Sequence, residues 1–133
     1  MSSDAAPDQV VDPIDVVARW QQRAWCECDL DAVDELVAEP FVRHGPQGTA
    51  TRTHAELKHD LRQYQRALGK PTLTVHGRVA DGDRVFSQVT LRGANFDTGE
   101  LRTVERLQVH RVVDGRIVEV WSLYALDVDW SDD

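Results

Sequence analysis

The hydrophobic positions along the chain follow two different periods, and the change falls near residue 71. Before it, apolar side chains recur every three or four positions, which is the spacing of one face of an α-helix. After it, apolar and polar side chains alternate, as in strands that have one buried face. Helices followed by an antiparallel sheet indicate an α+β fold.

Three helices are predicted in the first half. The first begins at Asp12-Pro13, where an aspartate can cap the helix and a proline fits its first turn. A second, shorter helix follows Asp29, so that the two would form a helical hairpin. The third begins at Thr53-His54-Ala55-Glu56, which has the sequence of a capping box, and ends near Gly69.

Four strands in an antiparallel meander are predicted after residue 71, with one short extra strand after the second helix. Asp114-Gly115 is the tight-turn signal between the last two strands, 103–113 and 116–125. The helices are available to cover one face of such a sheet, and a cleft between the two layers is a common place for a ligand. We therefore expect three helices packed on a curved, mostly antiparallel sheet, with an internal pocket.

The composition narrows the classes of function. The chain has 133 residues, of which 41% are hydrophobic and 29% charged, as in an ordinary globular domain. Its formal net charge of -8 argues against nucleic-acid binding, which needs a basic face. The sequence has no run of roughly 18 apolar residues and no basic, apolar start typical of a secretory signal. We expect a cytoplasmic protein without nucleic-acid or membrane partners.

The organisation expected is a single domain over residues 13–127, after a disordered lead of residues 1–12 and before an acidic tail of residues 128–133. Cys26 and Cys28 form a lone C-x-C. A structural zinc site usually needs four ligands, and neither a second cysteine pair nor a spaced histidine pair follows. We expect reduced cysteines and no metal.

Four stretches of sequence resemble one known family. They are Asp29–Leu36, Phe41–Pro46, Arg92–Glu100 and Arg111–Trp121. Together they resemble the SnoaL-like polyketide cyclases of the nuclear transport factor 2-like superfamily, over roughly residues 14 to 127. The resemblance implies a cone-shaped fold, no cofactor, and a homodimer formed through the open face of the sheet.

The resemblance also implies an activity. In the cyclases, an acidic residue near the end of the last strand removes a proton next to a carbonyl, and the enolate closes a ring by aldol addition. The family pattern places that acid at Ala125 here, and the nearest acid is Asp127. We expect a cofactor-independent cyclase or isomerase acting on a polyketide-like or aromatic compound. The alternative is a non-catalytic ligand-binding or dimerisation module of the same fold.

Three residues are candidates for proton transfer. His44 precedes a Gly-Pro pair, where relatives present a polar side chain to the cavity, and a neutral imidazole can serve as acid or base near pH 7. Asp127 lies on the same face as Trp121 if the strand stays extended, because side chains alternate between the two faces. It either reaches the cavity or begins the acidic tail. Glu105 falls on the same face of its predicted strand as the apolar residues Leu107 and Val109. Burial among them would raise the pKa of its carboxyl and suit it to proton transfer. The competing interpretation is that Glu105 pairs with an arginine.

Five residues are candidates for contact with a ligand. Trp25, Tyr64 and Trp121 fall on apolar faces, where each either packs in the core or lines the cavity. His110 shares the polar face of the long strand with Arg106 and Gln108, and that face is either a polar pocket or the outer side of the sheet. Tyr124, of opposite parity to Trp121, completes the set.

Overall fold

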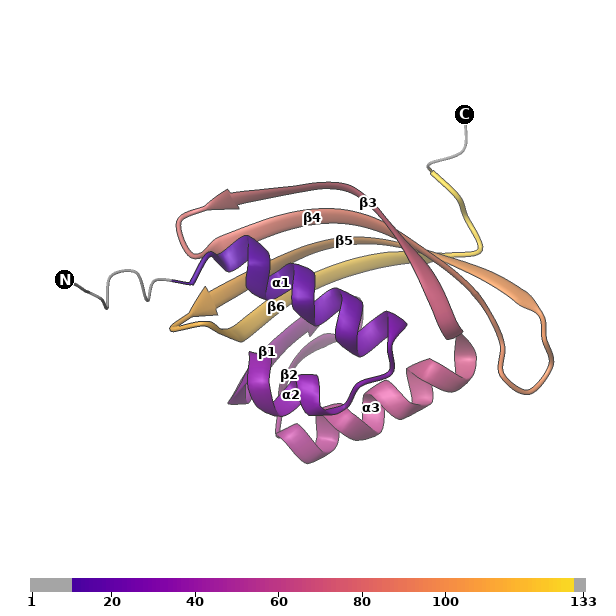
Figure 1. The fold of residues 1–133 in the computed structure, drawn as a ribbon, viewed down its shortest axis with the longest axis horizontal. Helices are drawn as coiled ribbons and strands as arrows, with labels where there is room; N and C mark the ends of the chain where they lie inside the picture. The colour runs from indigo at the N-terminus through magenta and orange to yellow at the C-terminus, as the bar shows by residue number, and fades with distance from the viewer. Residues whose placement is uncertain (1–10, 131–133) are drawn as a thin grey trace.

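The computed structural model describes residues 11–130 as a layer of helices packed on one face of a curved sheet (Figure 1). Among these residues the helices are α1 (Pro13–Trp20), its continuation as the π-helix η3 (Gln21–Cys26), α2 (Asp31–Leu36) and α3 (His54–Ala67). The sheet of the same described part consists of β1 (Val37–Gly45), β2 (Gly48–Arg52), β3 (Gly69–Asp81), β4 (Arg84–Ala94), β5 (Leu101–Val113) and β6 (Arg116–Leu126). The α+β architecture predicted from the sequence is confirmed.

The strands lie in the order β2-β1-β6-β5-β4-β3. β3 to β6 form the antiparallel meander that the alternating pattern predicts. The short extra strand is longer than expected: β1 begins at Val37, before Pro40, lies parallel to β6, and is joined to β2 as a hairpin. The sheet is therefore mostly antiparallel with one parallel pair.

Local signals fix where the helices start. Ile14 N–H donates to Asp12 Oδ1 at 2.9 Å, and Pro13 occupies the first turn of α1. At the start of α3, Thr53 and Glu56 form the complete capping box, each side chain accepting from the other residue's backbone N–H. A cap of this kind is worth about 1 kcal/mol. Both predicted starts are confirmed.

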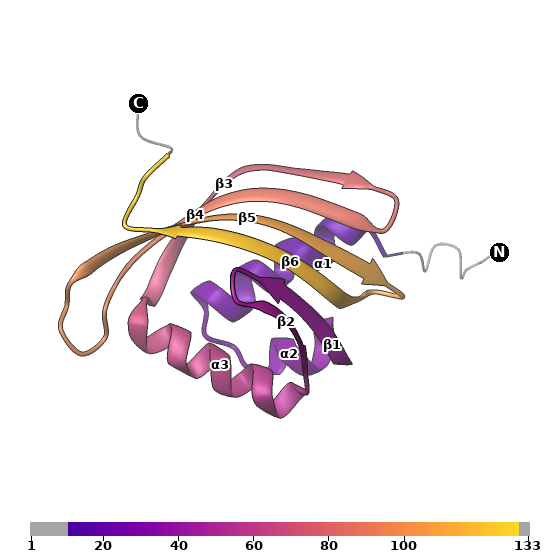
Figure 2. The same ribbon diagram turned by 180° about the vertical axis from the view of Figure 1, so that it is seen from behind.

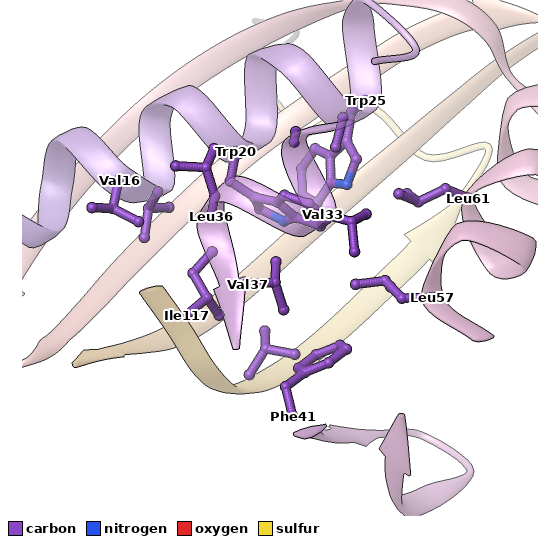
Figure 3. Close-up of a cluster of buried hydrophobic side chains, with 14 of the residues drawn as sticks. Val16, Trp20, Trp25, Val33, Leu36, Val37, Phe41, Leu57, Leu61 and Ile117 are labelled. Atoms are coloured by element: carbon purple, nitrogen blue, oxygen red, sulfur yellow. The ribbon is translucent and has the colours of Figure 1, made fainter. Parts of the chain in front are cut away.

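The hydrophobic core fills the space between the helices and the inner face of the sheet (Figure 3). Trp20 and Trp25 enter it from α1 and η3, and Leu57 and Leu61 enter it from α3. The strands contribute buried side chains at alternating positions, among them Val85, Val89, Leu91, Val120 and Phe41. The helical layer thus covers the inner face, and the inner face of the sheet is the one that can share a cavity with it.

The opposite, outer face of the sheet is covered by no helix of residues 11–130, as the two opposite views show (Figures 1 and 2). This face is nevertheless apolar. Val79, Phe86, Leu107 and Leu123 are 65%, 45%, 44% and 62% exposed, and they surround a shallow hollow with Trp121. No helix of the described part is long and apolar enough to cross a membrane.

Candidate active site

A cavity of about 750 Å³ lies between the helices and the inner face of the sheet. Its volume falls within the roughly 300–1,000 Å³ of small-molecule sites. One wall is apolar and includes Trp20, Trp25, Phe41, Leu57 and Leu61. The facing wall comes from β5 and β6 and carries Arg106, Gln108, His110, Ser122 and Tyr124. The cavity therefore sets polar groups on the sheet against an apolar surface on the helices.

Alternation along β5 places Arg106, Gln108 and His110 in a row on the cavity wall. Gln108 and His110 are 6% and 1% exposed. Among the described residues, no hydrogen-bond partner exists for the buried atoms Arg106 Nε, Gln108 Oε1 and His110 Nδ1. Buried polar atoms are normally satisfied, and leaving one unpaired costs about 1–3 kcal/mol. Such a row is typical of a site that a polar ligand completes.

His110 is a neutral imidazole on the cavity wall. Burial lowers the pKa of His110 to about 3, and the positive charges of Arg106 and Arg78 act in the same direction. A neutral imidazole carries one N–H donor and one lone pair. With the proton on Nε2, the buried Nδ1 presents its lone pair as a proton acceptor.

Arg106 lies in a cage of aromatic side chains. Its guanidinium carbon is 5.1 Å from the ring centroid of Trp25, 5.2 Å from that of Tyr64 and 5.7 Å from that of Tyr124. Nη1 donates to Ser122 Oγ at 3.4 Å. Burial raises the pKa of Tyr64, and the charge of Arg106 partly offsets that rise. The phenol therefore stays protonated at neutral pH.

Asp60 is the one acidic side chain among the described residues that line the cavity. Arg43 binds its carboxylate at 3.0 Å and Arg52 at 2.8 Å, so its negative charge is already compensated. The charged side chains that line the cavity are therefore mostly positive, and Arg106 among them favours negative charge on a bound molecule.

His44 lies at the rim of the cavity with its ring turned to the outer face. It is in register with Trp121, and the two rings stack with centroids 5.0 Å apart. His44 Nε2 lies 2.7 Å from Glu119 Oε2, and Nδ1 lies 2.8 Å from Thr49 Oγ1. Because Ser122 lines the cavity, alternation along β6 places Trp121 and Glu119 on the other side of the sheet. Trp121 thus lines the outer hollow and not the inner cavity.

Glu105 and Asp127 also lie away from the cavity. Glu105 is fully buried, and its carboxylate accepts from Thr90 Oγ1 at 2.6 Å and from Trp130 N–H at 2.5 Å. Its burial is as one interpretation of the sequence expected, and no ion pair joins it to an arginine of residues 11–130. Asp127 is exposed, and its ion pair with Arg102 holds the pKa of the Asp127 carboxyl below its usual range.

Five of the residues predicted from the sequence therefore line the cavity. Trp25, Tyr64, His110 and Tyr124 meet in it, and His44 lies at its rim. Arg106 and Gln108 are not among the site residues predicted from the sequence, although the alternation places both on one face with His110. A signal was present: three consecutive same-face positions of a long strand are polar. Within residues 11–130, no group of three or more His, Cys, Asp or Glu side chains could hold a metal ion.

Helices on one face of a curved sheet, with a polar row of strand residues facing the cavity between them, define a cone-shaped α+β pocket protein. The sequence matches the SnoaL-like domain over residues 15–120, and the chain belongs to this family. No curated protein matches the sequence at a significant level.

Solved structures agree with this assignment. IdmH from Streptomyces antibioticus, described as a proposed polyketide cyclase, is 27% identical, with 86% of this chain and 92% of IdmH covered and a TM-score of 0.74. A proposed polyketide cyclase from Acidithiobacillus ferrooxidans is 17% identical, with 84% of this chain and 87% of that protein covered and a TM-score of 0.77. A proposed isomerase from Bacillus subtilis is 16% identical, with 86% of this chain and 90% of that protein covered and a TM-score of 0.70. The last two show the shared fold.

Proposed function

We propose that the protein binds a carbonyl-bearing, polyketide-like or aromatic small molecule in this cavity and transfers a proton next to the carbonyl, as a cofactor-independent cyclase or isomerase. The observation that carries the proposal is the row Arg106, Gln108 and His110, which lines a cavity with apolar side chains and holds buried polar atoms without partners among the described residues. The apolar wall suits a ring system, and the polar row suits its oxygen atoms. Membership of the SnoaL-like family and the likeness to IdmH support the same class of chemistry.

His110 is the proton acceptor in this proposal. Its Nδ1 lone pair takes the proton from the carbon next to the carbonyl, and the electron pair of that C–H bond moves into the enolate. The positive charge of Arg106 stabilises negative charge that develops on the carbonyl oxygen, because few opposing charges screen it inside the cavity. Glu105 and Asp127 take no part, since neither lines the cavity. His44 takes no part because its ring, at the rim, stacks on Trp121 on the outer side of the sheet.

A pKa of about 3 makes His110 by itself a weak base, since a general base works best when its pKa lies near the operating pH. A negative charge beside the ring raises the pKa of the imidazole. The enolate supplies such a charge as it forms, so the imidazolium and the enolate stabilise each other as a pair.

Hydrogen–deuterium exchange at the carbon next to a carbonyl tests this function directly. We expect wild-type protein to accelerate exchange of the C1 protons of 2-tetralone in D2O, followed by NMR, over buffer alone. His110→Gln should lose about 100-fold of that acceleration, the scale of general-base catalysis. His44→Gln and His59→Gln are the controls, because the first ring faces outward and the second is exposed on α3.

Binding of 2-tetralone without accelerated exchange would contradict the catalytic proposal and favour the non-catalytic ligand-binding module. Equal loss of exchange in His44→Gln and His110→Gln would contradict the assignment of the base. Each protein is first compared by circular dichroism, so that loss of exchange is separated from loss of fold.

The homodimer implied by the family resemblance is also a proposal, with the outer face of the sheet as its interface. Its support is the exposed apolar set Val79, Phe86, Leu107 and Leu123 around Trp121. Contiguous exposed apolar side chains of this kind often mark a protein–protein interface. The second copy would bury the hollow and leave the cavity, on the inner face, open to ligand. The cytoplasmic location expected from the sequence stays a prediction.

A further inference from the structure

Arg106 differs from the other arginines of the cavity in having no counterion. Arg43 pairs with Asp60, and Arg102 pairs with Asp127. No carboxylate of residues 11–130 forms an ion pair with Arg106. Its Nη1 donates to Ser122 Oγ at 3.4 Å, and its side chain also acts on the Tyr64 hydroxyl, whereas a guanidinium has five donors in all.

The surroundings of Arg106 attract its charge and use few of its donors. The three rings of the aromatic cage hold the cation through their π faces. Nε is buried and has no partner in the described part of the chain. Arg106 is half-buried, and a charge partly removed from water is stabilised by an opposite charge and by hydrogen bonds. The cage supplies no opposite charge, so Arg106 favours a ligand that brings one.

We propose that the ligand carries a carboxylate, that this carboxylate binds Arg106, and that Arg106 thereby selects anionic substrates over neutral ones. The inference deepens the proposed function and rests on it for the location of the substrate. A carboxylate offers two acceptor oxygens in a plane, which match the paired N–H groups of a guanidinium. A neutral ketone can accept one of these hydrogen bonds but leaves the charge uncompensated. An aromatic ring next to the carboxylate would pack among Trp25, Tyr64 and Tyr124.

A bound carboxylate would also change His110. The positive charge of Arg106 is one reason why the pKa of His110 is low. An anion on Arg106 offsets that charge and raises the pKa of His110 toward the range in which it is an effective base. Binding of the charged substrate would therefore prepare the base before the proton is transferred.

A matched pair of probes tests the selection. Naphthalene-2-carboxylate and 2-naphthamide have the same ring and nearly the same shape, and differ in charge. We expect calorimetry at pH 7.5 to show the carboxylate binding wild-type protein about 10- to 100-fold more tightly than the amide. The preference should disappear in Arg106→Gln and persist in Arg62→Gln, whose exposed side chain lies on α3 outside the cavity.

Equal affinity of the two probes for the wild-type protein would overturn the inference, and so would failure of the carboxylate to bind. A preference that survives in a folded Arg106→Gln would do the same. The comparison on the wild-type protein needs no variant, so it stands even where Arg106→Gln does not fold.

The outcome is separable from that of the exchange experiment. Exchange of 2-tetralone that depends on His110, together with equal binding of the two naphthalene probes, would leave proton transfer standing and remove the carboxylate inference. Selective binding of the carboxylate without any accelerated exchange would support the carboxylate inference and contradict proton transfer. The protein would then be a binding protein for aromatic acids. A rise in the pKa of His110 on binding, measured from its imidazole NMR signals, is expected with naphthalene-2-carboxylate and not with the amide.

Discussion

Replacing His110 with glutamine should flatten the dependence of stability on pH in the acid range. In the folded protein the pKa of His110 is about 3, whereas a histidine in the unfolded chain titrates near 6.5. Below pH 6.5 the unfolded chain therefore binds more protons than the folded one, and the free energy of unfolding falls as pH falls. The stability linked to neutral His110 is fully present above pH 6.5 and is lost between pH 6.5 and 3.

The magnitude follows from the two pKa values. Each pH unit in this window removes about 1.4 kcal/mol, so the loss from His110 is about 2 kcal/mol at pH 5 and about 5 kcal/mol at its limit. A loss of 2 kcal/mol is a large fraction of the 5–15 kcal/mol that is typical of a folded domain. The effect is large because the side chain is 1% exposed and Arg106 repels an additional positive charge.

Urea unfolding at pH 8, 7, 6 and 5 measures this effect. The difference between wild type and His110→Gln isolates the histidine, because the carboxylates titrate alike in both proteins. We expect the wild-type free energy of unfolding to fall by about 2 kcal/mol more than that of the variant between pH 8 and pH 5. His59→Gln, at an exposed position, should run parallel to wild type. Parallel curves for wild type and His110→Gln would refute the view that His110 is held neutral by burial.

Two further expectations concern the assembly and the fold. Leu123→Lys places a charge in the outer hollow and should convert the proposed dimer to a monomer, measured by light scattering after size-exclusion chromatography, while 2-tetralone exchange stays within about twofold of wild type. An unchanged mass would place the interface elsewhere. Thr53→Ala removes one half of the capping box of α3 and should lower the free energy of unfolding by about 1 kcal/mol, whereas Thr53→Ser should keep most of the wild-type stability. Equal losses of stability in the two variants would show that the hydroxyl does not cap the helix.

The helices could be predicted from the sequence because their signals are local. Asp12-Pro13 and the capping box at Thr53 lie within a few residues of the backbone groups that they satisfy. The parallel pairing of β1 with β6 could not be predicted in the same way. It joins Val42 with Glu119, residues far apart in the sequence, and no local pattern specifies such a partner.

The site was harder to predict because alternation separates two faces of a strand without showing which one is covered. On β6 the apolar pair Trp121 and Leu123 favoured an inward assignment, yet Ser122 faces the cavity. The usual rule that the apolar face lies inside fails here, since the outer face of the sheet is itself apolar. The same ambiguity left His110 undecided between a polar pocket and the outer surface, and the packing of α1 and α3 on the sheet resolves it.

The division of the cavity into two walls has an evolutionary consequence. The groups proposed for proton transfer and charge recognition sit on β5, held by neighbouring strands on both sides, whereas the surface that fits the ring system comes largely from α1, η3 and α3. Substitutions at Leu57 or Leu61 can therefore enlarge or reshape the space for a ligand without moving His110 or Arg106. Proteins with this arrangement can change which molecule they bind through successive single substitutions, and each variant along the way retains His110 and Arg106 in place.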